Sequence, residues 1–138
     1  MLRYRLTHPE VLAALAAAGH GAGVLVADGH YPVSTASGPA ARRVWLNLTA
    51  GRPTVTEVAE VLCDAVVVEG ATVMQPPPGE PEPEAFADFT RLLPSERALT
   101  RLGRFDFYAA ARSPDLALVI ATGDVRTYAN LLLTLGVA

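Results

Sequence analysis

Short apolar runs recur along the chain, and each is bounded by glycine, proline or polar residues. Two of the runs are apolar throughout, which is typical of strands that are buried on both faces of a parallel α/β sheet. A third run alternates between apolar and polar residues, and a fourth contains three consecutive valines. We therefore predict strands near residues 23–28, 43–48, 65–69 and 116–121, with a short one at 99–102.

Segments with helical spacing lie between these strands. The first begins at the Thr-His-Pro-Glu sequence of residues 7–10, and Gly19 ends it. The second begins at Thr54, which precedes Glu57 by the spacing of a capping box. Two further segments with helical spacing cover residues 84–93 and 104–112. The alternation predicts an α/β fold in a single domain, residues 1–138, with a mainly parallel sheet flanked by helices.

Three other segments have no helical or strand pattern that settles their structure. Residues 33–41 are rich in Ser, Thr, Gly, Ala and Pro, which predicts a loop. Residues 75–84 combine prolines with glutamates, which is typical of an extended surface loop. Residues 131–137 are almost entirely apolar and fit either a helix or an edge strand.

The composition excludes several classes of partner. The 138 residues are 51% hydrophobic and 18% charged, as in a compact globular domain. The net charge of -3 comes without a basic block, so we expect neither nucleic acid nor an anionic membrane as partner. Cys63 is the only cysteine, so there is no disulfide framework. No segment has the length and hydrophobicity of a membrane span, and we expect a cytoplasmic protein.

His20, Asp28 and His30 form a cluster of ionisable residues around the first predicted strand. His20 lies between two glycines that favour exposure of its imidazole, and the other two follow the strand's carboxyl end, where open α/β sheets bind ligands. Two imidazoles and a carboxylate together can transfer protons near neutral pH. The alternative is that they are surface histidines and an ordinary Asp-Gly turn. The loop at residues 33–41 follows directly and is placed to cover this site.

Two further groups of polar residues are candidates for ligand binding. Arg104, Tyr108 and Arg112 are spaced four apart, which places them on one face of a helix. The alternative is a solvated helix face with Phe105 turned inward. The second group is Tyr128 and Asn130, which are two residues apart and would face the same side of an extended chain. A phenol and an amide on one side suit a polyhydroxylated ligand, and a turn at this position is the alternative.

Taken together, these motifs resemble the family of D-ribose pyranases and L-fucose mutarotases, which are small cofactor-free enzymes of sugar uptake. Each motif alone is weak, but their order and spacing over nearly the whole chain are specific. The motifs are His8-Pro9-Glu10-Val11-Leu12, Gly19-His20-Gly21, Asp28-Gly29-His30-Tyr31-Pro32, Arg104-Phe105-Asp106-Phe107-Tyr108, Thr122-Gly123-Asp124, Tyr128-Ala129-Asn130 and the apolar C-terminal stretch.

The sequence resembles the fucose branch more than the ribose branch, with departures. His30 and Pro32 after the aspartate, and Arg104 with Tyr108, look like the fucose branch. Residues 50–54 and the Tyr-Ala-Asn motif look like the ribose branch, and Asn47 stands where both branches tend to have aspartate. These departures leave the sugar open and do not affect the type of reaction.

The resemblance implies an aldose mutarotase that exchanges sugar anomers by acid-base opening and closure of the ring. Alternatives are a D-ribose pyranase, a sugar-binding or regulatory module without catalysis, and a purely structural oligomer. The chain lacks a Cys/His ligand set, a phosphate loop and a dinucleotide fingerprint, so we expect no metal and no cofactor. The implied catalytic residues are His20, Asp28 and Tyr108, and the implied substrate-binding residues are His30, Arg104, Tyr128 and Asn130.

The family also implies a ring-shaped homo-oligomer, with a decamer as one size. The alanines of residues 13–18 and the apolar C-terminal stretch offer surfaces that a second chain would cover. We therefore expect an active site shared between subunits. In this prediction His20 and Asp28 come from one chain, and Tyr128 and Asn130 come from its neighbour.

Overall fold

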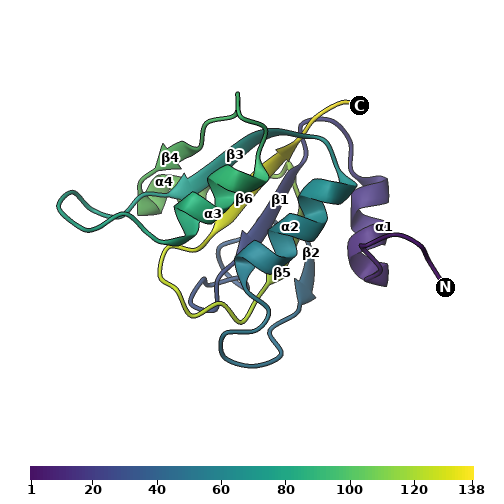
Figure 1. The fold of residues 1–138 in the computed structure, drawn as a ribbon, viewed down its shortest axis with the longest axis horizontal. Coiled ribbons are helices and arrows are strands. Elements are labelled where there is room, and N and C mark those ends of the chain that lie inside the picture. The colour runs from purple at the N-terminus through teal and green to yellow at the C-terminus, as the bar shows by residue number, and fades with distance from the viewer.

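The computed structural model describes residues 1–138 as one six-stranded sheet with four helices (Figure 1). The strands lie side by side in the order β2-β5-β1-β6-β3-β4. They are β1 (Gly23–Ala27), β2 (Arg42–Trp45), β3 (Val68–Met74), β4 (Thr100–Leu102), β5 (Leu116–Ala121) and β6 (Leu131–Leu135). The helices are α1 (Pro9–Ala17), α2 (Val55–Ala65), α3 (Ala85–Leu92) and α4 (Arg104–Ala111).

Five of the six strands run in the same direction. β5 pairs in parallel with β1 and β2, and β3 pairs in parallel with β4. β6 is antiparallel to both of its neighbours, β1 and β3. The connection from β5 to β6 contains no helix and does not return the chain to the other end of the sheet, so β6 enters from the edge where β5 ends. The predicted mainly parallel α/β sheet is confirmed, with β6 as its exception.

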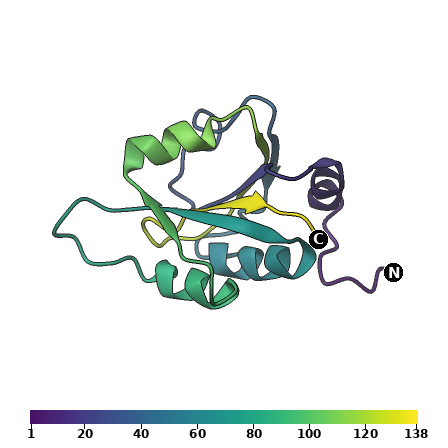
Figure 2. The same cartoon turned by 90° about the horizontal axis from the view of Figure 1, so that it is seen from above.

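Each face of the sheet has its own hydrophobic core. Successive side chains of a strand point to opposite faces, so Val24 and Val26 of β1 join one core while Leu25 joins the other. The first core lies beneath α1, α2 and α3, and the second lies beneath α4 and the loop at residues 33–41. Figure 2 shows α4 on one side of the sheet and α2 with α3 on the other. Both faces of the sheet are therefore covered by the chain itself.

The predicted start of α2 is confirmed, but the strand predicted at residues 65–69 is wrong in its position. Thr54 Oγ1 accepts a hydrogen bond from the Glu57 amide, and the Glu57 carboxylate accepts one from the Thr54 amide, which completes the capping box. The helix continues to Ala65, where the valine run was expected to begin a strand. β3 begins at Val68 because the amide of Val66 still bonds back to the helix.

β6 corrects the prediction for the apolar C-terminal stretch. It is neither a helix nor an edge strand, because β1 and β3 pair with its two sides. Leu131 and Leu133 are completely buried, and Leu132 on the opposite face is 9% exposed. The chain therefore covers this stretch by itself, and its hydrophobicity does not require a neighbouring subunit.

α4 corrects the prediction that Phe105 turns inward. Phe107 is completely buried, whereas Phe105 is 79% exposed. Phe107 and Ala111 are four residues apart and both face the second core, while a residue two positions before Phe107 lies on the far side of the helix. The same helical geometry determines which side of α4 reaches the candidate site.

Candidate functional site

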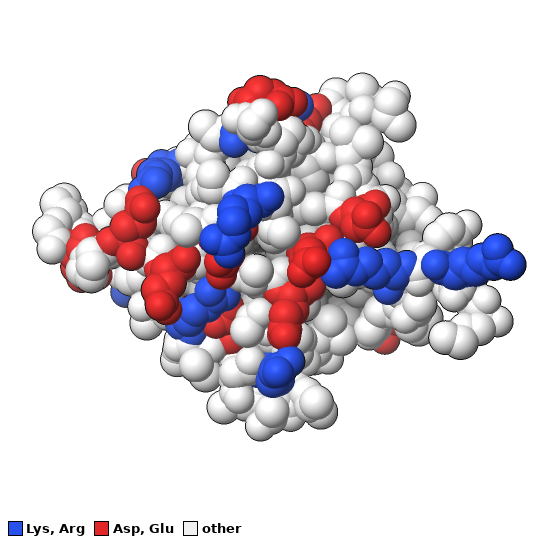
Figure 3. Space-filling view, in the orientation of Figure 1, with Lys and Arg blue, Asp and Glu red and all other residues white.

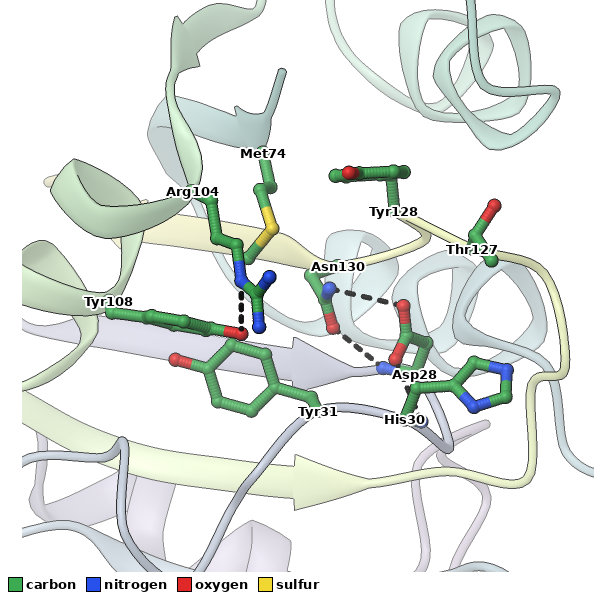
Figure 4. Close-up of a pocket in the computed structure, with 9 residues that line it drawn as sticks. All are labelled: Asp28, His30, Tyr31, Met74, Arg104, Tyr108, Thr127, Tyr128 and Asn130. Atoms are coloured by element: carbon green, nitrogen blue, oxygen red, sulfur yellow. Dashed lines mark hydrogen bonds between the residues drawn. The ribbon is translucent and has the colours of Figure 1, made fainter. Parts of the chain in front are cut away.

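The candidate site lies at the edge of the sheet where β1 and β5 end and β6 begins. Because β1 and β5 are parallel and β6 is antiparallel to β1, this edge brings together residues from the N-terminal part of the sequence, after β1, and from the C-terminal part, between β5 and β6. They surround a cavity of about 230 Å³ (Figure 4). Its lining residues are Asp28, His30, Tyr31, Met74, Arg104, Tyr108, Thr127, Tyr128 and Asn130.

Asp28 is the buried carboxylate of this cavity. Its Oδ1 accepts a hydrogen bond from the His30 amide at 2.9 Å, and its Oδ2 accepts from the Ala129 amide and from Asn130 Nδ2 at 3.1 Å each. The Asp28 amide in turn donates to Asn130 Oδ1 at 2.8 Å. Asp28 and Asn130 therefore hold each other in one orientation, and the second lone pair of Asp28 Oδ1 and one Nδ2 hydrogen of Asn130 are left for a ligand.

Burial raises the pKa of the Asp28 carboxyl above its ordinary value. The residue is only 3% exposed, and low polarity around it disfavours the charged form. Hydrogen bonds from the backbone amides of His30 and Ala129 favour the charged form but offset only part of this effect on the pKa. A carboxyl group with this balance is suited to both giving and accepting a proton.

Arg104 and Tyr108 form the opposite wall of the cavity, one turn apart on α4. Arg104 Nε donates a hydrogen bond to Tyr108 Oη at 3.2 Å, and its terminal nitrogens form no hydrogen bond within the chain. Tyr31 packs edge-on against the Tyr108 ring, with the ring centroids 5.5 Å apart, and its hydroxyl donates to the carbonyl of Ala36 at 2.6 Å. The wall therefore presents a guanidinium group and a phenol on an aromatic base (Figure 4).

Arg112 lies on the same helical face but does not line the cavity. Its guanidinium carbon lies 5.8 Å from the centroid of the Tyr108 ring, and its Nε donates to the carbonyl of Thr35 at 3.3 Å. The solvated-face alternative for α4 is thus wrong for Arg104 and Tyr108, which face the cavity. The loop at residues 33–41 contributes no lining residue, so it supports Tyr31 and Arg112 rather than covering the site.

Tyr128 reaches the cavity from a strained backbone position. Its φ is 58°, a left-handed conformation that is uncommon for an aromatic residue and costs about 1 kcal/mol or more. Tyr128 lies in a turn, as the alternative interpretation of this segment expected. The turn nevertheless places both Tyr128 and Asn130 against the cavity. Strain of this kind persists where the surrounding structure holds the residue for a function.

A network of charged side chains holds the connection between β5 and β6 to the helices. Arg126 donates to both carboxylate oxygens of Asp124, to Asp88 Oδ2 at 2.9 Å and to Thr56 Oγ1 at 2.9 Å. Asp124 is 1% exposed and also accepts from the amide of Val55 at 2.9 Å. The network anchors the segment that carries Tyr128 and Asn130, on the face where α2 and α3 present intermixed acidic and basic side chains (Figure 3).

His30 lies at the rim of the cavity. The residue is exposed, and its Nε2 is 3.1 Å from the carbonyl oxygen of Val125, so this nitrogen carries the proton when the ring is neutral. Figure 4 shows the ring directed away from Arg104 and Tyr108. Its backbone amide, rather than its ring, makes the contact with Asp28.

His20 does not lie beside Asp28 within the chain, which corrects the prediction of one cluster around β1. His20 precedes β1 and Asp28 follows it, so the whole strand, roughly 15 Å at about 3.3 Å per residue, separates them. The His20 ring is instead hydrogen-bonded to Glu69, with 2.9 Å between Nε2 and Oε2. Sequence proximity was misleading because an extended strand places its two ends far apart.

The predicted division of the site between two chains is also wrong in part. It placed Asp28 and Asn130 on different subunits, whereas the two side chains are hydrogen-bonded within one chain. Tyr128 lines the same cavity as Asp28. Among the catalytic and substrate-binding residues that the resemblance implies, His20 alone does not line this cavity.

Three lining residues were not predicted from the sequence, namely Tyr31, Met74 and Thr127. Tyr31 lies inside the Asp-Gly-His-Tyr-Pro motif directly after His30, and this position was an available signal. Met74 is the last residue of β3, and the early placement of that strand concealed its position at the site edge. Thr127 precedes Tyr128 in the turn and carries no distinguishing pattern.

The structure also bears on metal binding and membrane insertion. No group of three or more His, Cys, Asp and Glu side chains is placed to hold a metal ion. None of the helices has the length and apolar character that crossing a bilayer requires.

Comparison with known proteins places this geometry in a wider context. The sequence profile of the RbsD / FucU transport protein family matches residues 1–138. A D-ribose pyranase of Streptomyces avermitilis is 36% identical over 137 residues, which cover 99% of this chain and 98% of that protein. A fucose mutarotase of Homo sapiens is 33% identical over 143 residues, which cover 96% and 90%.

Solved structures show the same fold. The structure of Bacillus subtilis RbsD complexed with D-ribose has a TM-score of 0.85 and 25% identity, and the match covers 100% of this chain and 99% of that one. The structure of FucU from Bifidobacterium longum has a TM-score of 0.81 and 28% identity over 95% and 94% of the two chains. The chain is similar to a comparable extent to the ribose proteins and to the fucose proteins, so these comparisons do not assign it to either branch.

Proposed function

The chain belongs to the RbsD / FucU transport protein family, and we propose that it is a cofactor-free isomerase that interconverts the anomers of an aldose. The observation that carries the proposal is the buried carboxyl of Asp28 in a small polar cavity. A volume of about 230 Å³ is below the roughly 300–1,000 Å³ of sites for drug-sized ligands, and it suits a monosaccharide.

The reaction needs two proton transfers. A base takes the proton of the anomeric hydroxyl, the bond between the anomeric carbon and the ring oxygen breaks, and an acid protonates the ring oxygen. Closure on the other face of the aldehyde reverses both transfers. Because sugar anomers also exchange spontaneously, acid-base groups that each contribute about 10²–10⁴-fold provide sufficient catalysis.

The residues of the cavity divide these tasks between them. Asp28 gives or accepts a proton, and Asn130 orients it and donates its remaining N–H to a sugar hydroxyl. Tyr108 is the second proton-transfer candidate within the cavity, and Arg104 donates to sugar oxygens from its terminal nitrogens. Tyr128 packs against the sugar, and His30 binds a hydroxyl at the rim.

We further propose that His20 completes the cavity of a neighbouring subunit in a homo-oligomer, for which a ring such as a decamer is one arrangement. Its side chain is 60% exposed and lies at the opposite end of β1 from its own chain's cavity. An exposed histidine at one end of the subunit complements a cavity at the other end, whose own histidine, His30, lies at the rim with its ring directed away from Arg104 and Tyr108. In this form of the shared site, Asp28, Tyr128 and Asn130 come from one chain and His20 from another.

Saturation-transfer NMR tests the enzyme function directly. The intact protein should accelerate exchange between the anomer signals of L-fucose, which we propose as the main substrate, or of D-ribose, whose pyranose and furanose signals report ring-size change as well. His20→Ala should remove most of the acceleration and leave the fold intact. Binding of a sugar without faster exchange, across both sugars and other common aldoses, would instead identify a non-catalytic binding module.

Mixing two inactive variants tests the shared site. His20→Ala and Asp28→Ala each leave every site without one partner. After unfolding and refolding together at equal amounts, hybrid oligomers should recover about one quarter of the wild-type rate, because half of the cavities and half of the histidines are intact. Activity that does not recover in a correctly refolded mixture would show that both residues serve the same chain's site.

A further inference from the structure

Met74 differs in chemistry from every other residue that lines the cavity. The other lining side chains end in a carboxylate, an amide, a hydroxyl, an imidazole or a guanidinium group, each of which can bind a sugar hydroxyl. The thioether of Met74 donates no hydrogen bond and accepts one only weakly. Met74 is therefore the one lining residue whose side chain has no polar end.

The pairing of β3 with its two neighbours fixes the position of Met74. On one side β3 pairs in parallel with β4, where Met74 lies opposite Leu102. On the other side β3 pairs with β6, where Val73 lies opposite Leu131, so the next step of the same register brings Met74 beside Asn130. Side chains at such cross-strand positions are close enough to pack together. Met74 is thereby placed next to the amide that orients the buried carboxyl of the cavity.

The Met74 side chain is packed firmly, although it reaches the cavity. The residue is 4% exposed and belongs to the second hydrophobic core, beneath α4. Figure 4 shows its side chain pointing toward those of Arg104 and Asn130. A sugar hydroxyl placed against the thioether would lose its water and gain no strong hydrogen bond, whereas a methyl group would gain apolar contact.

The substituent on C5 of a pyranose is the group that most needs such a contact. C5 is bonded to the ring oxygen, so its substituent lies close to the bond that breaks. The carbons C2, C3 and C4 carry hydroxyl groups, which match the polar part of the lining. L-Fucose carries a methyl group on C5, L-galactose has the same ring with a hydroxymethyl group, and D-arabinose has the same ring with hydrogen only.

We propose that Met74 determines specificity by receiving the C5 substituent of the sugar, and that it selects a methyl group at this position. This inference rests on the proposed function and names 6-deoxyaldoses as the preferred substrates. A hydroxymethyl group would leave its hydroxyl without a strong partner beside the thioether. Hydrogen alone would leave a gap there and forfeit the apolar contact.

The three sugars measure this selection, because they differ only at C5. In saturation-transfer NMR the wild type should favour L-fucose over L-galactose about 10–100-fold in kcat/KM, and over D-arabinose about 10–200-fold. Each ratio is independent of the fraction of folded protein, so it can be compared between variants. Equal kcat/KM for the three sugars, or a preference for either of the other two, would overturn the inference. No acceleration with any aldose would instead refute the proposed function.

Two variants change the chemistry of the contact and keep much of its volume. Met74→Gln places an amide there and should raise kcat/KM for L-galactose relative to L-fucose at least about 10-fold. Met74→Leu stays apolar and should retain the preference for L-fucose. Val73→Ala is the matched control, because Val73 lies on the same strand, is completely buried in the other core and lines no part of the cavity. It should lower stability without changing either ratio, and an unchanged ratio in Met74→Gln would refute the role of Met74.

A binding experiment observes the contact without turnover. The only other methionine is Met1, which is exposed at the N-terminus, so protein labelled with ¹³C at the methionine methyl groups provides its own control. L-Fucose should shift the Met74 signal, leave the Met1 signal unchanged, and show a nuclear Overhauser effect between the Met74 methyl group and the C6 protons of the sugar. A Met74 signal that saturating L-fucose does not shift, or one that contacts only ring protons, would overturn the inference.

Discussion

Replacement of Arg126 by methionine should destabilise the protein strongly, because it removes the cation that pairs with the buried carboxylate of Asp124. The guanidinium group bonds to both oxygens of Asp124 and also reaches Asp88 and Thr56. Methionine preserves much of the side-chain volume but leaves the carboxylate of Asp124, 1% exposed, without its partner charge. Removal of one member of a buried ion pair typically costs about 3–5 kcal/mol.

Urea unfolding measures this loss as a change in the free energy of unfolding. Arg91→Met is the control, because Arg91 pairs with the same Asp88 but its side chain is 70% exposed. It should change stability by less than about 1 kcal/mol. Adding Asp124→Asn to Arg126→Met should recover at least about 1 kcal/mol of the free energy of unfolding, since the buried carboxylate without a partner charge is then absent. A loss below about 1 kcal/mol in Arg126→Met would refute the reasoning.

The same network predicts how stability depends on pH. Burial would raise the pKa of Asp124, but hydrogen bonds from Arg126 and the Val55 amide outweigh it and hold the pKa below its ordinary value. A carboxyl with a lowered folded-state pKa stabilises the protein above its unfolded-state pKa of about 3.9, and this contribution is lost as the pH falls further. The wild type should therefore lose stability below about pH 4, and Arg126→Met should show a weaker dependence in that range.

Three further predictions concern the cavity and the segments around it. Gly123→Ala should destabilise the protein by more than about 2 kcal/mol in urea unfolding, because a Cβ would lie 2.2 Å from the carbonyl oxygen of Thr49. Gly103→Ala has no atom near its Cβ and should cost less than about 1 kcal/mol, since Gly103 is the N-cap of α4, where alanine is slightly less favourable than glycine. Asp28→Asn should lower the exchange rate at least about 10²-fold, since the amide cannot give a proton as an acid and cannot accept hydrogen bonds from all three N–H groups that bond to the carboxylate. A wild-type exchange rate in this variant would show that Asp28 has no part in catalysis. Light scattering at micromolar concentration should show an oligomer, and a monomeric mass would contradict the shared site.

Local patterns in the sequence were sufficient for most elements of the fold. The apolar runs at β1 and β5 and the capping box of α2 depend on neighbouring residues, and all three predictions were confirmed. β3 and β6 were misplaced or left undecided because valine and leucine runs suit helices and strands alike. Pairing between distant strands decided their structure, and pairing partners cannot be recognised in a single sequence.

The sequence by itself determined which chemical groups are available: a histidine between glycines, an aspartate at a strand end, and polar residues on one face of α4. Only the tertiary structure decided which of them meet. The parallel pairing of β1 with β5 and the reversed direction of β6 bring Asn130 to Asp28, across about a hundred residues of sequence. The extended length of β1 separates His20 from both and leaves it beside Glu69, because a strand carries its two ends to opposite edges of the sheet.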